Sequence, residues 1–284
     1  MARKLETLAQ GIVFGEGPRW HAGRLFFSDI KGHRVEAVDQ DGKRETVVQL
    51  QGEPSGLGWL PDGRMLVVSM LDHRLLRLDP EGLREVADLS AHCSGKANDM
   101  VVDALGRAYV GNIGFDLEAQ PIAPRPTKLV RVDPDGSVHV AARELWCPNG
   151  LAIGADGRTL VAAESAAGRL AAFNVAADGS LSGQRVFAPL PEGAAPDGIC
   201  MDAEDAVWVA SPTTREFLRV REGGEVAERI PTGERIAIAC AIGGPARRTL
   251  FLITSATMSL AEAGRGRSGR IETCEVAVPG AGWP

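Results

Sequence analysis

The amino-acid sequence predicts an all-β protein, a six-bladed β-propeller with four-stranded blades. A short motif recurs six times: a polar or small residue, usually followed by Gly, then an apolar stretch. Apolar runs are bounded by Asp-Gly or Pro-Asp-Gly turns, which are strong hairpin signals. No stretch of the 284 residues keeps a 3.6-residue period, so few helices are expected.

The repeated motif sets the number of blades. Its first residues are separated by 39, 43, 51, 48 and 43 positions, a period typical of arrays whose unit is a four-stranded sheet. The six sites are Glu16-Gly17, Ser55-Gly56, Asn98-Asp99, Asn149-Gly150, Asp197-Gly198 and, most degenerate, Cys240-Ala241. Because the repeat runs the length of the chain, we expect residues 1–284 to form a single propeller domain.

The second unit shows the order of elements most clearly. An apolar run at 56–60 precedes the turn 61–63, and β-rich segments follow at 65–69, 74–78 and 83–89. The second-strand segments of the other units are 24–27, 107–110, 158–161, 206–209 and 249–252. Third-strand segments are predicted at 34–38, 128–132, 169–173 and 217–220.

The two ends of the sequence predict how the ring closes. The last unit ends with a third strand at 269–276 and has no fourth, whereas an orphan strand at 3–8 precedes the first motif. We therefore expect the N-terminal strand to complete the last blade, with Leu5 pairing onto the strand that contains Ile271. Such closure removes sheet edges that would otherwise template aggregation.

Composition excludes several classes of partner. A net charge of −6 and a pI near 5.5 argue against nucleic-acid binding. Residues 1–10 lack the apolar core of a signal peptide, and the longest apolar run, 236–242, is too short for a membrane span. Five scattered cysteines without a CxxC motif indicate reduced thiols, so we expect a soluble, cytoplasmic protein.

Four of the six motif positions carry side-chain oxygen ligands, namely Glu16, Asn98, Asn149 and Asp197. Asp-Gly and Asn-Gly are also common turn dipeptides, and turn chemistry alone is the alternative interpretation. The hairpin turn, however, comes about seven residues after the motif, so these residues precede the innermost strand of each blade. Equivalent positions in a closed ring point toward one axis, which predicts a shared central site.

The chemistry of these four side chains suits one divalent cation. Two carboxylates and two amide oxygens are hard ligands, which favour Ca²⁺, Mg²⁺ or Mn²⁺ over a thiolate or imidazole zinc site. The identity of the ion stays open, with Zn²⁺ and iron included. The charges of Glu16 and Asp197 balance a divalent ion, which would remove the repulsion between two carboxylates on a narrow axis.

Two further residues are candidate substrate contacts. Lys96, two residues before Asn98, could project its ammonium group toward the same central site, or could be a solvated surface lysine. Asp116 belongs to the irregular segment 113–127, which lengthens the interval between the third and fourth motifs. Such a loop is interpreted either as a pocket wall or lid, or as a tolerated surface insertion.

Four motifs together resemble the regucalcin (senescence marker protein)/gluconolactonase family. They are Gly15-Glu16-Gly17-Pro18-Arg19-Trp20, Asn98-Asp99, Pro148-Asn149-Gly150-Leu151-Ala152 and Pro196-Asp197-Gly198-Ile199. The resemblance covers essentially the whole chain, in the family's order. It implies a six-bladed propeller with one divalent cation on the axis.

By resemblance, Glu16, Asn149 and Asp197 are metal ligands, Asn98 is a further ligand or a substrate contact, and Asp197 is the acid/base. Family members typically hydrolyse sugar lactones, and relatives cleave other lactones or phosphorus esters. Lys96 departs from the family pattern, because the animal sugar-lactonase members have Arg there. Lys lacks the planar fork of Arg, which puts an aldonolactone substrate in question but leaves the metal set unchanged.

The sequence thus predicts a metal-dependent lactonase or esterase acting on a small-molecule ester. The cation would polarise the lactone carbonyl, and Asp197 would take a proton from water and return it to the leaving alkoxide. Two alternatives keep the same ring: a phosphotriesterase-type hydrolase, and a propeller that binds a cation or metabolite without turnover.

Overall fold

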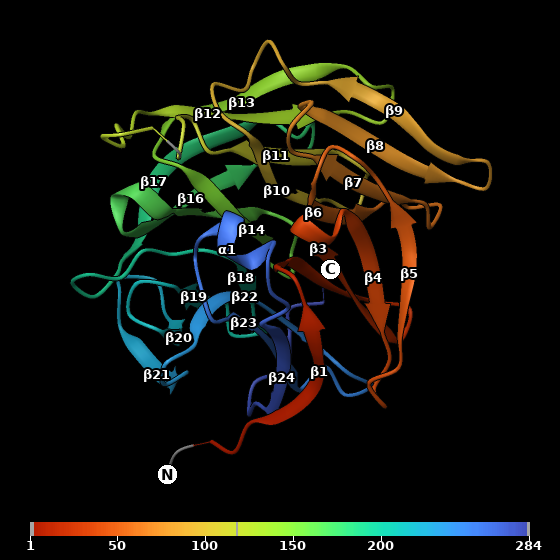
Figure 1. Ribbon diagram of the computed structural model, residues 1–284. Coiled ribbons are helices and arrows are strands. Elements are labelled where there is room, and N and C mark those ends of the chain that lie inside the picture. The colour runs from red at the N-terminus through yellow and green to blue at the C-terminus, as the bar shows by residue number, and fades with distance from the viewer. Residues whose placement is uncertain (1–2, 118, 283–284) are drawn as a thin grey trace.

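The protein is a six-bladed β-propeller, and this confirms the fold predicted from the sequence (Figure 1). A computed structural model describes residues 3–117 and 119–282. Its six sheets each contain four antiparallel strands and fan out around a common centre.

Each strand has a fixed radial place in its blade. The innermost strands are β2 (Gly15–His21), β6 (Pro54–Trp59), β10 (Ala97–Val102), β14 (Pro148–Ile153), β18 (Ile199–Met201) and β22 (Ile236–Gly243). The second strands are β3 (Arg24–Asp29), β7 (Met65–Ser69), β11 (Ala108–Asn112), β15 (Thr159–Glu164), β19 (Val207–Ser211) and β23 (Thr249–Ser255). The third strands are β4 (Arg34–Val38), β8 (Arg74–Asp79), β12 (Thr127–Val132), β16 (Arg169–Val175), β20 (Glu216–Val220) and β24 (Gly269–Glu275). The outermost strands are β5 (Arg44–Gln49), β9 (Gly82–Asp88), β13 (Val138–Leu145), β17 (Leu181–Pro189), β21 (Val226–Pro231) and β1 (Glu6–Ile12).

The N-terminal strand completes the sixth blade, as predicted, because β1 pairs with β24. Its position differs from the predicted segment 3–8: the strand runs from Glu6 to Ile12, and Leu5 precedes it. Leu5 was expected to pair onto the strand that contains Ile271, but the pairing with β24 begins at Glu6, opposite Thr273, and Ala9 is the partner of Ile271. The strand extends farther because two register shifts and Gly11, at a φ of 77°, let the chain keep pairing beyond residue 8.

Burial follows the radial place of the strands. All residues of β6 and β7 are buried, whereas β5 has none that is fully buried. The inner strands are covered by neighbouring blades on both faces, so their sequences are apolar or small. The outer strands meet water along one face and carry the charged residues.

Inner strands of adjacent blades come closer together than a side chain would allow. A Cβ added at Gly56 would lie 2.3 Å from the backbone nitrogen of Met100, and one at Gly150 would lie 2.5 Å from that of Ile199. This close approach explains why the motif contains Gly in four of its six copies.

The sixth copy of the motif lies at Ile238-Ala239, so its assignment to Cys240-Ala241 was wrong. The backbone nitrogen of Gly150 donates to the oxygen of Asp197 in the next blade at 3.2 Å. The equivalent bond from Gly198, at 3.0 Å, ends on Ile238. The sixth blade therefore contributes a buried apolar side chain to the ring rather than a thiol.

The end of the axis opposite the motif residues is narrow. A bridge between Asp202 and Gly280 and a hydrogen bond of 3.0 Å from Ala281 to Met201 lay the C-terminal segment across it. The pocket there, lined by Arg19, Val101 and Met201 among others, is partly open and measures about 30 Å³, enough for a water molecule but not for a substrate. A substrate would therefore have to enter from the motif end.

Helices are few in the described part of the chain. They comprise α1 (Leu260–Ala263), in the β23–β24 connection, and the 3₁₀ turns η1 (Ile30–Gly32) and η2 (Ser165–Ala167). Within residues 3–117 and 119–282, no helix is long and apolar enough to cross a bilayer.

Candidate metal centre and active site

Three of the predicted ligands form one group at the axis. Asn149, the second residue of β14, donates from Nδ2 to Oδ1 of Asp197 at 2.5 Å, and the carboxyl of Glu16 lies near enough to Asp197 for the charge of one to raise the pKa of the other. Glu16 is on β2, and Asp197 lies two residues before β18. Side chains from blades 1, 4 and 5 therefore meet, which places all three in the interior of the ring.

The two carboxyl groups are held close together in a dry environment. Glu16 and Asp197 are 8% and 7% exposed. Burial raises the pKa of Asp197 to about 7, and the charge of Asp99 adds to this shift while the Asn149 hydrogen bond opposes it. Burial and then the charge of Asp197 raise the pKa of Glu16 well above its usual range.

Asn98 lies in β10, the inner strand next to β14, and is 8% exposed. Its Oδ1 accepts a hydrogen bond of 3.4 Å from Oγ of Ser55, the motif residue of the second blade. Ser55 was not assigned a role from the sequence, although its position as the first residue of the second motif copy indicates that its side chain belongs to the ring. Five of the six motif positions therefore present side-chain oxygen atoms.

A buried ion pair next to this ring was also missed in the sequence. Nη2 of Arg19 lies 3.2 Å from Oδ1 of Asp99, and both side chains are almost fully buried. The same Nη2 donates to the carbonyl of Met100 at 2.6 Å, and Asp99 Oδ2 accepts from the backbone of Leu151 at 3.3 Å. Asp99 occupies the motif position that is Gly in four other copies. This departure from the repeat is the sequence signal that could have pointed to a special role for Asp99.

The two predicted substrate contacts lie in different surroundings. Lys96 Nζ is 3.9 Å from Oε2 of the buried Glu53, whose other carboxylate oxygen pairs with Lys31. Lys96 and Glu53 both stand two residues before a motif residue, so this ion-paired group lies beside the ring. Asp116 is exposed on the connection between β11 and β12.

The donor set fits a hard divalent cation. It offers two carboxylates and two amides, and the hydrogen bond from Asn149 Nδ2 leaves Oδ1 of that amide as an oxygen donor. A cation between Glu16 and Asp197 would neutralise both charges and remove their mutual repulsion. Within residues 3–117 and 119–282, no three His, Cys, Asp or Glu side chains gather into a metal-binding group. The amides are therefore needed to complete this site.

Known proteins resemble this chain over nearly its whole length. A family model, the SMP-30/Gluconolactonase/LRE-like region, matches residues 14–257. A 6-deoxy-6-sulfogluconolactonase of Pseudomonas putida is 27% identical over 289 residues, covering 98% of this chain and 96% of the relative. Regucalcin of Danio rerio is 30% identical over 254 residues, covering 87% and 84%.

A solved structure agrees with these sequence matches. A gluconolactonase of Xanthomonas campestris superposes with a TM-score of 0.77 and 25% identity, covering 96% of this chain and 90% of that one. The matched region contains all six motif copies. This chain therefore belongs to the SMP-30/gluconolactonase/LRE-like family.

Proposed function

We propose that the protein is a divalent-metal-dependent hydrolase that opens a lactone ring at the motif end of the propeller axis. The observation that carries the proposal is the convergence of Glu16 and Asn149 on Asp197 in a buried group. Family membership supports lactone chemistry, because relatives that match nearly the whole chain are named as lactonases.

Glu16, Asn98, Asn149 and Asp197 would hold the cation. When bound, a divalent cation supplies Lewis acidity for the ester carbonyl and lowers the pKa of water. Glu16 brings the second negative charge, and the two amides fix geometry without adding charge. The Ser55 hydroxyl orients Asn98 through its 3.4 Å hydrogen bond.

Asp197 would act as the general acid/base. One of its oxygens takes a proton from the attacking water while the water oxygen bonds to the carbonyl carbon. The bond to the ring oxygen then breaks, and Asp197 returns the proton to the leaving alkoxide, giving a hydroxy acid. The Asn149 hydrogen bond at 2.5 Å would hold the Asp197 carboxylate in one orientation during both transfers.

Lys96 is proposed to contact the substrate from the rim of the ring, where Glu53 limits the positions of its ammonium group. Asp116 is proposed as a second polar contact because it lies on the connection that follows β11, at the motif end. Neither residue would take part in bond making. Their substitution should therefore raise KM more than it lowers kcat.

The proposal is tested by assaying a panel of aldonolactones, aliphatic lactones and phosphotriesters with the purified protein alone, with a chelator, and with the chelator followed by Ca²⁺, Mg²⁺, Mn²⁺ or Zn²⁺. We expect hydrolysis that the chelator abolishes and at least one cation restores. Hydrolysis that survives complete metal removal would contradict the metal requirement. Turnover of phosphotriesters but of no lactone would assign the site to a different ester class, and cation binding without turnover would make the protein a binding module.

A further inference from the structure

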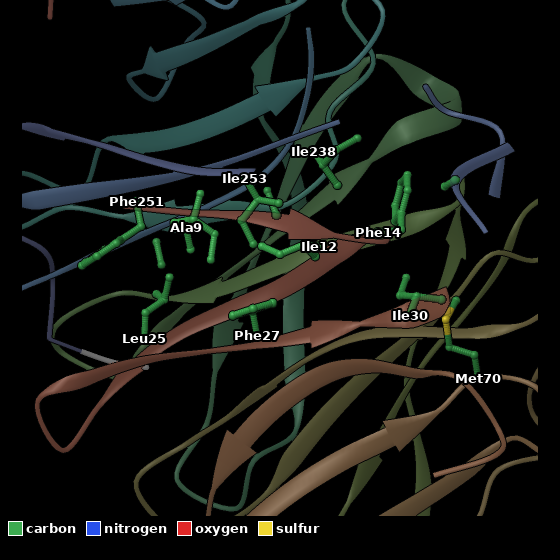
Figure 2. Close-up of a cluster of buried hydrophobic side chains, with 14 of the residues drawn as sticks. Ala9, Ile12, Phe14, Leu25, Phe27, Ile30, Met70, Ile238, Phe251 and Ile253 are labelled. Atoms are coloured by element: carbon green, nitrogen blue, oxygen red, sulfur yellow. The ribbon is translucent and has the colours of Figure 1, made fainter. Parts of the chain in front are cut away.

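A buried apolar collar lies immediately beyond the proposed metal ligands. It consists of Phe14, Ile30, Met70, Ile113, Phe115 and Ile238, none more than 6% exposed. All six belong to one contiguous group of packed side chains, and Figure 2 shows Phe14, Ile30, Met70 and Ile238 within it. They come from blades 1, 2, 3 and 6. Phe14 immediately precedes inner strand β2, Ile238 lies in inner strand β22, and Ile30, Met70 and Ile113 each directly follow a second strand.

Backbone hydrogen bonds place the collar at the motif end. Ile30 donates to the carbonyl of Phe14 at 2.9 Å, directly beyond the pair Gly15–Asp29 that starts the first blade. Equivalent bonds run from Met70 to Glu53 at 2.8 Å and from Ile113 to Lys96 at 2.9 Å. Each acceptor stands two residues before a motif residue, so the collar forms the next layer outward from the ring.

The short helix α1 covers part of this collar. Ala263 is 1% exposed and belongs to the same packed cluster, and Leu260 packs against it. The segment around α1 is held together by its own polar groups: Ser259 Oγ accepts from the Glu262 backbone at 3.2 Å, and Thr257 Oγ1 donates to Glu262 at 2.7 Å. The contacts of α1 with this cluster, through Ala263 and Leu260, are apolar.

Exposed apolar side chains continue outward from the collar at the same end. In the described part of the chain, six large apolar side chains are at least 46% exposed. Four of them follow second strands, in connections at the motif end: Leu71, Leu117, Ile122 and Met258. The other two, Leu105 in the β10–β11 turn and Val186 on outermost β17, lie elsewhere. This excess of exposed apolar side chains at the motif end favours that end as the binding face.

We propose that the substrate is a lactone bearing an apolar alkyl or aryl substituent, which lies in the collar under α1 while the ester ring reaches Asp197. This inference rests on the proposed function for the position of the ester. A polyhydroxylated lactone would bury hydroxyl groups against Phe14, Ile30 and Met70, which offer them no hydrogen bonds, and such burial is unfavourable. An alkyl chain gains by leaving water for the same surface.

The first test compares γ-butyrolactones with alkyl substituents of zero to eight carbons against aldonolactones. We expect kcat/KM to rise roughly fourfold per methylene group until the collar is filled, because that factor corresponds to burial of one CH₂. An aldonolactone hydrolysed faster than every alkyl lactone would overturn the inference while leaving the proposed function intact. Absence of hydrolysis on all of them would overturn the proposed function.

A binding measurement keeps the two proposals separate. Alkyl-substituted γ-lactams keep the ring and the substituent but resist hydrolysis, so calorimetry with them needs no turnover. We expect affinity to rise with chain length by a similar factor per methylene group. Affinity independent of chain length, or stronger for the unsubstituted lactam, would overturn the apolar assignment whether or not the protein is a hydrolase.

Substitutions at the exposed rim locate the binding region without disturbing the core. Met258→Ser and Leu71→Ser replace side chains that are 49% and 46% exposed, so folding should be unaffected. We expect each to reduce the advantage of the longest chain severalfold. Leu105→Ser, at a 61% exposed position in the β10–β11 turn, is the matched control and should leave the chain-length series unchanged. Equal effects at all three positions would contradict the inference.

Discussion

Arg19 and Asp99 form a buried ion pair that joins the first blade to the third, with Nη2 3.2 Å from Oδ1. The two residues are 80 positions apart in the sequence, and the pair lies beside the ring that contains Glu16. The charge of Asp99 raises the pKa values of both ring carboxyls, whereas Arg19 lowers that of Glu16. One contact therefore connects the packing of the blades to the electrostatics of the proposed site.

Removal of Asp99 should destabilise the protein strongly. Asp99→Ala leaves the Arg19 guanidinium buried without its carboxylate, and we expect the free energy of unfolding to fall by about 3–5 kcal/mol in a urea titration. The control is Asp62→Asn, which removes the charge of an exposed carboxylate paired with Arg64 and should leave the urea midpoint unchanged. Similar small shifts in both variants would show that the buried pair does not stabilise the ring.

The glycine at an inner-strand contact should not tolerate a methyl group. Gly56→Ala places Cβ 2.3 Å from the Met100 backbone nitrogen, which cannot move aside without shifting β10. We expect a loss of about 1–3 kcal/mol or more in the free energy of unfolding. Gly266→Ala is the matched control, because the nearest atom to its added Cβ is the Glu262 oxygen at 4.0 Å. A Gly56→Ala melting temperature equal to that of Gly266→Ala would refute the close-contact argument.

The catalytic role of Asp197 is tested by an isosteric change. Asp197→Asn keeps an oxygen for the cation but removes the proton acceptor, so kcat should fall by roughly 10²–10⁴. Part of the metal binding should remain. Asp62→Asn changes an Asp-Gly of similar sequence that lies in an exposed hairpin, and its activity should match the wild type. Equal kcat values in the two variants would reject the assignment.

The ligand role of Asn149 predicts a change in affinity rather than in folding. Asn149→Ala removes one oxygen donor and the 2.5 Å bond that orients Asp197, and we expect metal affinity to fall at least about tenfold. Asn174→Ala, on the exposed end of β16, should bind metal as the wild type does. Calorimetric titration of each chelator-treated variant measures the difference, and an unchanged dissociation constant for Asn149→Ala would exclude it from the ligand set.

The raised pKa of Asp197 predicts opposite pH trends with and without metal. The folded-state pKa is about 7, above its unfolded value near 4, so the metal-free fold binds a proton more tightly than the unfolded chain does. Its stabilising effect is complete below about pH 4 and is lost as the pH rises through 7, by at most about 1.4 kcal/mol per unit.

A bound cation displaces that proton, so the stabilisation by metal should grow over the same range. Melting temperatures from pH 5 to 8, with chelator and with saturating cation, measure both trends. Asp197→Asn should flatten the metal-free trend. Parallel curves with and without cation would contradict the assignment of Asp197 as a ligand.

The repeat was readable from the sequence because the same close contact is made in most blades. Gly56 and Gly150 are constrained by neighbouring backbone, so the sequence marks each inner strand at a regular period. The sixth copy does not follow this pattern. Ile238-Ala239 offers neither a polar residue nor Gly, because Ala239 is small enough for the contact and the ring position faces apolar neighbours.

Side-chain partners were less predictable than strand order. Arg19 and Asp99 are 80 positions apart, and no sequence pattern links them, because their contact depends on how the ring closes. The same holds for Lys96, whose pairing with Glu53 joins adjacent blades. The grouping of Glu16, Asn149 and Asp197 could be anticipated because all three occupy the first position of the motif. In a closed ring of repeats, equivalent positions come close together at the centre.

The pairing of β1 with β24 also has a consequence for the order in which the protein is made. During synthesis, residues 6–12 emerge before any blade, yet their hydrogen-bonding partner at residues 269–275 emerges after the other five blades. Those five blades can fold as they appear, while the early segment must wait beside them as an unpaired strand. Residues 6–12 are thus among the last to acquire their native contacts, and a ribosome-bound chain remains an open arc until residues 269–275 have emerged.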